Sequence, residues 1–327
     1  QTCALRSDAV IVDTKDFGLN ANFNISYNRA KIDKLAGGQT WQSSNWGGKP
    51  AGQNDFFIEE GGRLGEVYGY ELDGFYTTDD FSWDGSKWIL NENLTDPTEL
   101  IKYNNFGPGS LKLKADEDGK FTKKRLGNTV PTVTGGFGIN MRYKNFDLSA
   151  FFNYSLGNKI VNATKLGSSY YNDTKKGWNL NDNFTLAKRY SWIDPSTGEN
   201  MLKSSYIKSN GLDYTINRLN EINAGASMYN PGSITEMPLL DWAVEDGSFL
   251  RVNNISIGYT LPKVFVNKMF MQNVRIYVTG YNLYCFTKYS GADPEVDTRR
   301  STPMTPGVDY SAYPKSRSFV GGINVTF

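Results

Sequence analysis

The chain contains Asp, Glu, Ser and Cys residues that could do acid–base or nucleophilic chemistry, but it lacks the histidine that most such sites use. Histidine is absent from all 327 residues, which excludes Ser-His-Asp and Cys-His catalysis and removes the commonest ligand of catalytic zinc. An enzyme would therefore depend on paired carboxylates. The chain has 34 Asp and Glu residues, but no motif pairs two of them. We therefore predict a protein that is not an enzyme.

Metal and thiol chemistry has equally little support in the sequence. Asp116-Glu-Asp118-Gly119 resembles part of a calcium loop, but it lacks the later ligands and the bidentate glutamate of an EF-hand. A solvated acidic turn is the simpler interpretation. The two cysteines, Cys3 and Cys285, could form a disulfide in an oxidising compartment, although two unpaired thiols are favoured. We predict no metal and no cofactor.

The elements that must position the remaining residues are β-strands with alternating side chains. In the last ten residues, apolar side chains alternate with small and polar ones up to the terminal Phe327. The run 17–28 alternates in the same way, with Asn, Gly and Ser on its second face. A soluble β-sandwich gives this period with core and solvent on the two faces, whereas a transmembrane barrel gives it with lipid and a wet lumen.

The order of strands and connections favours the membrane barrel. We predict about seven strands, within residues 5–12, 17–28, 131–143, 146–155, 248–261, from 274 onward, and 318–327. A phase change at Asn253-Asn254 indicates a bulge, and the phase blurs after Gly280. Short connections at 13–16, 144–145 and 262–273 alternate with long polar ones at 31–128, 156–246 and 287–317, as in barrels with short periplasmic turns and long extracellular loops. A short helix is expected near Asn183 to Tyr190.

Composition agrees with this interpretation. No apolar run reaches the roughly 18 residues of a membrane-spanning helix. Mean hydropathy is −0.49 and aromatic residues make up 14%, which fits a barrel in which every second strand residue is apolar. The aromatic ends of the hairpin 131–155, with Tyr143 and Phe146 at its turn and Tyr154 at the far end, are typical of membrane-interface girdles. The net charge of +1 argues against a nucleic-acid partner.

Several short motifs then occur in order near the C-terminus. They are Ser248 to Arg251, Ile255 to Pro262 (ISIGYTLP), Gly280 to Leu283, Asp293 to Val296 (DPEV) and the final Phe327. This set resembles the C-terminal end of the SusC/RagA family of TonB-dependent outer-membrane transporters of Bacteroidota. The resemblance implies an all-β fold: residues 1–327 would form the C-terminal strands of a larger transmembrane antiparallel β-barrel of about 22 strands. An odd-stranded piece would leave open edges in lipid, so we expect further strands outside this chain. By resemblance, the plug and N-terminal domains would also lie outside it.

The same resemblance implies active nutrient uptake. The complete protein would import oligosaccharides or oligopeptides together with a SusD-like surface lipoprotein, energised by TonB through the missing N-terminal part. The long loops would be extracellular and the C-terminus periplasmic. The alternatives are a structural or adhesive outer-membrane β-protein, a passive porin and, least favoured, an enzyme built on a membrane barrel. The resemblance does not distinguish a glycan from a peptide ligand.

Aromatic side chains in the long loops are the candidate ligand contacts, since Trp and Tyr stack on sugar rings or pack on peptide side chains. They are Tyr170, Tyr171, Trp178, Trp192 and Tyr289. The alternative is that these rings pack the loops together or onto the lipoprotein. Asp293 and Pro294 are interpreted as loop architecture, with Asp293 accepting backbone hydrogen bonds. By resemblance, Phe327 is part of the signal for barrel assembly.

Overall fold

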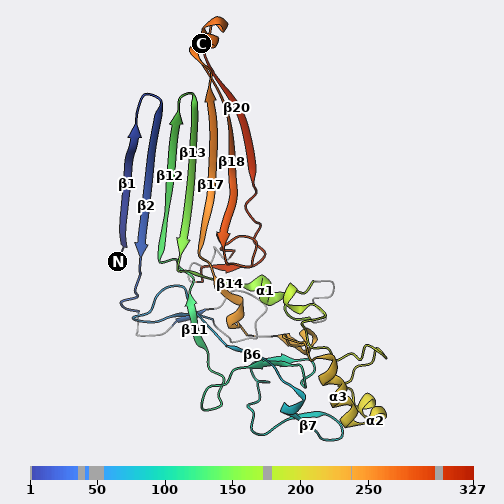
Figure 1. The fold of residues 1–327 in the computed structure, drawn as a ribbon. Coiled ribbons are helices and arrows are strands. Elements are labelled where there is room, and N and C mark those ends of the chain that lie inside the picture. The colour runs from blue at the N-terminus through green and yellow to red at the C-terminus, as the bar shows by residue number, and fades with distance from the viewer. Residues whose placement is uncertain (1, 36–40, 44–54, 172–178, 237, 299–304) are drawn as a thin grey trace.

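The computed structural model describes residues 2–35, 41–43, 55–171, 179–236, 238–298 and 305–327. It consists of an upright sheet with a body of folded loops at one end (Figure 1). The sheet is antiparallel, with seven strands in the order β1-β2-β12-β13-β17-β18-β20. The strands are β1 Thr2–Asp13, β2 Phe17–Asn28, β12 Val133–Tyr143, β13 Phe146–Leu156, β17 Phe249–Thr260, β18 Asn273–Thr287 and β20 Ser318–Thr326. The predicted all-β fold and all seven predicted strands are confirmed.

The register joins the alternating patterns of the strands into two continuous faces. Phe137 of β12 pairs with Phe23 of β2 on one side and with Phe152 of β13 on the other, and the rings of Phe137 and Phe152 stack at 4.6 Å. One residue along, Gly138 of β12 pairs with Asn22 of β2, so the second face is polar and small. A slip of one residue would exchange the two faces of a strand, so the alternation excludes odd shifts, and the two-residue turn 144–145 fixes the register of β12 against β13.

The predicted bulge is confirmed in β17. The register shifts between Val252 and Asn254 against both neighbouring strands. Before the bulge the apolar face carries Leu250 and Val252, and after it Ile255 and Ile257. The phase of β18 blurs opposite this point because Asn282 adopts a positive φ of 51°. The extra residue thus keeps apolar side chains on one face along the whole strand.

Three short connections lie at the end of the sheet opposite the loop body (Figure 1). Residues 14–16 and 144–145 form tight turns, the first closed by the Thr14 hydroxyl, which donates to the Phe17 carbonyl at 2.9 Å. The third contains the short helix α4 (Lys263–Val266) and a 3-10 turn, Asn267–Met269. No helix among the described residues is long and apolar enough to cross a membrane.

The three long segments leave the other end of the sheet and fold together. We call their described residues within 31–128, 156–246 and 287–317 the loop body. Its strands are β3 Trp41–Ser43, β4 Phe56–Ile58, β5 Glu66–Gly69, β6 Leu72–Phe75, β7 Phe81–Trp83, β8 Trp88–Leu90, β9 Lys102–Tyr103, β10 Leu111–Leu113, β11 Lys124–Asn128, β14 Lys159–Asn162, β15 Ile234–Glu236, β16 Val244–Asp246 and β19 Val308–Asp309. Its helices are α1 Ala163–Gly167, α2 Ser204–Asn210 and α3 Leu212–Ile222.

The helix expected near Asn183 to Tyr190 was placed wrongly. That stretch contains a 3-10 turn, Asp182–Phe184, and a second turn in which the Lys188 and Arg189 N–H groups donate to the Thr185 carbonyl, but no α-helix, whereas the longest helix among the described residues is α3. Leu212, Ile216 and Leu219 recur at helical spacing in α3. This weak stripe becomes a stable helix because Leu219 is fully buried against the rest of the loop body.

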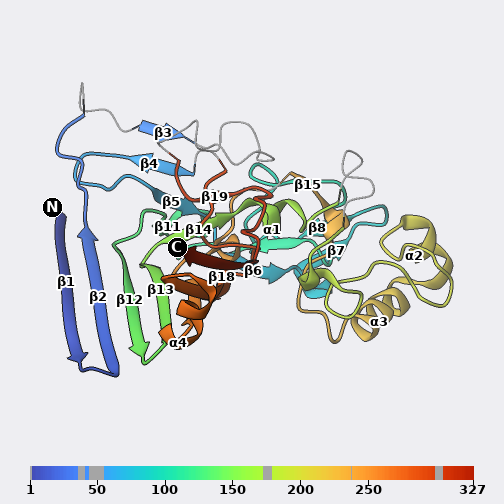
Figure 2. The same cartoon turned by 90° about the horizontal axis from the view of Figure 1, so that it is seen from above.

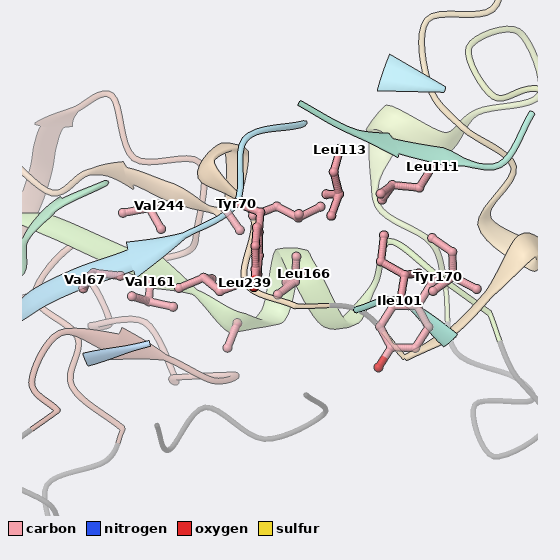
Figure 3. Packing of buried hydrophobic residues seen from close by; sticks show 14 of the residues in the cluster. Val67, Tyr70, Ile101, Leu111, Leu113, Val161, Leu166, Tyr170, Leu239 and Val244 are labelled. Atoms are coloured by element: carbon pink, nitrogen blue, oxygen red, sulfur yellow. The ribbon is translucent and has the colours of Figure 1, made fainter. Parts of the chain in front are cut away.

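Two apolar cores stabilise the loop body. The larger joins all three segments. Val67 and Leu111 come from the first segment and Val161 and Leu166 from the second (Figure 3), and Val308 comes from the third. The smaller core joins the first and second segments around Tyr76, Trp192 and Leu219. Each fully buried Val or Leu contributes about 1.5–3 kcal/mol. In Figure 2 the loop body extends to one side of the long strands.

Candidate functional site

A cavity of about 560 Å³ lies where the polar face of the sheet meets the loop body. Sheet residues Asn153 and Ser155 of β13 line it from one side, and Pro294 to Asp297 line it from the other. The Oδ1 atom of Asn153 is buried and has no hydrogen-bond partner among the described residues. Because a buried acceptor is costly when unpaired, this atom is suited to a hydrogen bond from a bound water or ligand.

A buried ion-pair network holds the DPEV motif beside this cavity. Arg251 of β17 contacts Asp293 at 2.6 Å (Nη2 to Oδ1) and Glu295 at 2.7 Å (Nε to Oε2). Lys315 contacts the same carboxylate oxygen of Glu295 at 2.5 Å. The side chains of Arg251 and Asp293 are 5% and 6% exposed. The network therefore fixes the third loop segment to the polar face of the sheet.

Asp293 also organises the backbone around it, as the sequence predicts. Its Oδ1 accepts a hydrogen bond from the Glu295 N–H at 2.9 Å, and its Oδ2 accepts one from the Lys315 N–H at 3.3 Å. One carboxylate thus serves an arginine and two backbone donors from separate parts of the loop. The prediction that Asp293 accepts backbone hydrogen bonds is confirmed.

A second cavity, of about 410 Å³, lies within the loop body and has a charged wall. Lys165, which lines it, contacts Glu245 at 3.1 Å, and the Ser290 hydroxyl donates to the same carboxylate oxygen at 2.7 Å. Burial raises the pKa of Glu245, but hydrogen bonds from Ser290 and Lys165 outweigh it and hold the pKa below its usual value. The other lining side chains are mostly Asn, Ser and Thr, together with Asp182 and Asp309, so the wall combines neutral hydrogen-bonding groups with two carboxylates and the Lys165 ammonium.

Three of the five candidate aromatic residues are buried within the loop body. Tyr170 is 4% exposed in the larger core, and burial raises its pKa to about 12. Trp192 is 6% exposed, and its indole N–H donates to the Pro108 carbonyl at 2.7 Å. Tyr289 is 6% exposed, and its hydroxyl donates to Asp309 at 2.6 Å. Desolvation by burial raises the pKa of Tyr289, and the hydrogen bond to Asp309 adds to this rise.

The other two candidates differ from these three. Tyr171 is 43% exposed and tied to the loop body by its backbone N–H, which donates to the Pro231 carbonyl at 2.8 Å. Trp178 lies outside the described residues. The structure therefore brings the four described candidates into one loop body without collecting their rings around one cavity, and ligand contact stays a prediction for all five.

Sequence reasoning missed three other exposed aromatic rings of this body, two of which are more exposed than Tyr171. Tyr313 is 88% exposed, Tyr214 is 51% exposed and Tyr310 is 42% exposed. The signal for Tyr313 was present, since it stands before Pro314 in a run of small and polar residues. Asn153 and Arg251 were also missed as site residues, because only the sheet register brings them beside the third loop segment.

The acidic turn at Asp116 folds on itself. The Asp116 Oδ1 accepts hydrogen bonds from the backbone N–H groups of Asp118 (3.1 Å) and Lys120 (2.8 Å), and the Lys120 bond is the main cause of a lowered Asp116 pKa. The described part of the chain has no group of three or more His, Cys, Asp or Glu residues placed to hold a metal ion.

Cys3 and Cys285 are both free thiols, so the alternative of a disulfide between them is wrong. The terminal Phe327 is 78% exposed.

Comparison with known proteins gives a consistent result. No protein-family model matches the chain. It is 30% identical to TonB-dependent receptor P3 of Formosa agariphila over 97% of this chain and 27% of the receptor. It is 24% identical to TonB-dependent receptor SusC of Bacteroides thetaiotaomicron over 96% of this chain and 25% of SusC. The chain thus spans about a quarter of the length of these curated relatives.

Solved structures show the same fold. A structure of the RagAB peptide transporter matches all of this chain and 29% of its own, with a TM-score of 0.56 and 20% identity. The RagAB peptide importer in its closed-closed state matches all of this chain with a TM-score of 0.57 and 21% identity.

The chain is similar in sequence to TonB-dependent receptors along almost its whole length, and it shares the fold of the RagAB transporter. Within that class, the resemblance to the SusC/RagA family inferred from the sequence motifs is confirmed along almost the whole chain. The relatives are named as receptors and transporters and none as an enzyme.

Proposed function

We propose that this chain forms part of the wall and outer loops of a SusC-like nutrient importer in the outer membrane of a Gram-negative bacterium of the Bacteroidota. The observation that carries the proposal is the seven-stranded sheet with one continuous apolar face and one polar face, in a chain similar along its length to TonB-dependent receptors. Such a sheet suits a wall between lipid and a wet lumen.

In this proposal, the loop body is extracellular and the C-terminus is periplasmic. The partners are the remainder of the barrel with its plug, a SusD-like surface lipoprotein, the TonB complex, outer-membrane lipid and an oligosaccharide or oligopeptide ligand. Each outer strand, β1 and β20, pairs with only one strand among the described residues. Open strand edges are not stable in lipid, which supports a larger barrel of which this sheet is a part.

Ligand contact is proposed for the five aromatic candidates of the loop body. Tyr171 has the most exposed ring of the four candidates that the structure describes. The buried rings of Tyr170, Trp192 and Tyr289 would shape the surface that carries it. For Trp178, ligand contact is proposed from its residue type alone. Tyr171→Ala should weaken ligand binding by about two- to tenfold, the loss of one aromatic contact of about 0.5–1.5 kcal/mol. Tyr171→Phe, which keeps the ring, is the matched control.

The experiment that tests the function is purification of the native complex in mild detergent, followed by identification of every copurifying chain by denaturing mass spectrometry. Recovery with a plug-bearing barrel segment and a surface lipoprotein is the expected result. Recovery as an isolated, intact and folded chain would overturn the importer and favour a structural or adhesive surface protein. Recovery in a complete barrel without a plug would favour a passive porin.

A further inference from the structure

One short connection at the tight-turn end of the sheet differs from the other two. Residues 14–16 (TKD) and 144–145 (KN) are polar, whereas residues 261–272 (LPKVFVNKMFMQ) carry most of their side chains as apolar groups. We call residues 261–272 the apolar turn. It projects beyond the sheet at the end opposite the loop body, as the orange helical segment of Figure 1.

The apolar turn exposes large side chains on a locally ordered backbone. Val264 is 69% exposed, Phe265 is 60% exposed and Phe270 is 93% exposed. The turn is nevertheless anchored, because Val266 is 1% exposed and the Gln272 N–H donates to the Thr326 carbonyl of β20 at 2.7 Å. The exposed groups are therefore held in place at the end of β17 and β18.

Phe270 is held in an unfavourable backbone conformation as well. Its φ of 54° and ψ of 33° place it in the left-handed helical region, which is a genuine outlier for a bulky residue. The conformation ends the 3-10 turn, where the Phe270 N–H donates to the Asn267 carbonyl at 3.3 Å. A residue without a Cβ would adopt it at less cost, so the position holds a bulky apolar ring, 93% exposed, at the end of the turn.

The surroundings of the turn identify its partner chemistry. The apolar face of the sheet ends beside it in exposed aromatic residues, with Tyr143 at 50% exposure and Phe146 at 54%. The Phe146 and Tyr259 rings lie 4.6 Å apart between β13 and β17. Aromatic rings at this level mark the boundary between hydrocarbon and headgroups. The apolar turn continues that boundary beyond the last strand residue.

Charge points to the same partner. The only charged residues of the turn are Lys263 and Lys268, and both are exposed. Two cations beside exposed Phe and Val side chains, with no acidic residue between them, suit a layer of lipid phosphates above acyl chains. A protein partner would have to supply acidic residues opposite Lys263 and Lys268. A phospholipid layer already supplies anionic phosphates at that position.

We propose that the apolar turn is an interfacial anchor that inserts Phe265 and Phe270 into the phospholipid leaflet at the tight-turn end of the sheet, with Lys263 and Lys268 on the phosphates. The proposal rests on the proposed membrane placement of the sheet. In that placement the leaflet is the periplasmic one. The anchor would fix the depth and tilt of β17 and β18 in the membrane.

The test uses the complete transporter in liposomes, with a nitroxide spin label at one position at a time. Its native cysteines, Cys3 and Cys285 included, are first replaced by serine. Collision with molecular oxygen reports lipid exposure, and collision with a water-soluble nickel complex reports water exposure. Labels at Phe265→Cys and Phe270→Cys are compared with Lys144→Cys in a polar turn at the same end.

The expected result is that labels at 265 and 270 collide several-fold less with nickel, and more with oxygen, than the label at 144. Nickel accessibility at 265 and 270 equal to that at 144 would overturn the anchor. Low accessibility to both reagents would overturn it too, since it would place the turn against protein.

A label at Ile257→Cys separates this failure from failure of the proposed function. Ile257 lies on the apolar face and is 53% exposed, so it should be oxygen-accessible in lipid. If Ile257 is nickel-accessible, the membrane placement of the sheet is wrong. If only positions 265 and 270 are nickel-accessible, the anchor alone is wrong. Replacing Lys263 and Lys268 with glutamate should raise nickel accessibility at 270 in anionic vesicles more than in zwitterionic ones.

Discussion

Replacing Arg251 with methionine removes the cation that two carboxylates of the third loop segment share. Asp293 is 6% exposed and lies 2.6 Å from Arg251, and Glu295 lies 2.7 Å from it. Removing one partner of a buried ion pair costs about 3–5 kcal/mol because the other charge remains buried and uncompensated. Lys315 still contacts Glu295 at 2.5 Å, so we expect the lower part of that range, about 3 kcal/mol.

Hydrogen exchange measures this cost where it acts. The Thr298 N–H donates to the Val308 carbonyl at 2.9 Å, five residues beyond Asp293, and therefore reports opening of this loop. At 1.4 kcal/mol for each factor of ten, a cost of about 3 kcal/mol speeds exchange there by about a hundredfold. The measurement is mass spectrometry of deuterium uptake in peptides spanning residues 293–298, in the complete protein.

The matched control is Arg142→Met, on the same polar face. Arg142 lies 3.3 Å from Asp13, and the two side chains are 50% and 72% exposed. An exposed pair contributes about 0–1 kcal/mol, so Thr298 should exchange at its original rate in this variant. If Arg251→Met changes Thr298 exchange no more than the control does, the network does not hold the loop and the argument from its burial is refuted.

Three further outcomes are expected. Gly258→Ala should destabilise the sheet by about 1 kcal/mol in urea unfolding from vesicles, because a Cβ there would lie 2.5 Å from the Arg275 guanidinium and would displace it from its ion pair with Asp147, whereas Gly321→Ala, with no atom nearer than 3.9 Å, should be near neutral. Trp192→Ala should cost the loop body about 3–5 kcal/mol, seen as a lower temperature of first trypsin cleavage; an unchanged temperature would make the ring dispensable for packing. The Tyr206 hydroxyl is the main cause that lowers the pKa of Asp194 to about 2 in the folded protein, below the value of about 4 for an unfolded Asp. The ionised Asp194 therefore stabilises the loop body above about pH 4, and this contribution is lost as the pH falls towards 2. The rate of pepsin cleavage of the original protein, divided by that of the Asp194→Asn variant, should therefore rise as the pH falls from about 4 to 2. A constant ratio would contradict the stabilising role of the ionised Asp194.

The sheet could be predicted from sequence because its signal is local. Alternation along 17–28 and 131–155 indicates each strand, and the phase change at Asn253 indicates the bulge, without knowledge of any distant residue. The short and long connections could be located for the same reason. Matching apolar faces then excludes shifts by an odd number of residues, and the tight turns at 14–16 and 144–145 fix the alignment within the two hairpins.

The loop body could not be predicted because its stability is non-local. Val161 of β14 pairs in parallel with Val308 of β19, which lies far along the chain in another loop segment. Neither strand shows alternation long enough to indicate its partner. The same limit applied to the aromatic candidates: Tyr170 and Trp192 have the composition of ligand-stacking residues, and only the cores that surround them show that they are buried.

The shared core of the loop body has a consequence for how such a protein could change what it recognises. Because residues of all three segments meet in one apolar cluster, no segment can be exchanged alone without leaving vacancies in the other two. Transplanting a single loop from a relative should therefore yield a poorly folded surface, whereas moving all three together should preserve it. Diversification of this surface would proceed by small changes at exposed positions such as Tyr171 and Tyr313, or by recombination of the whole unit.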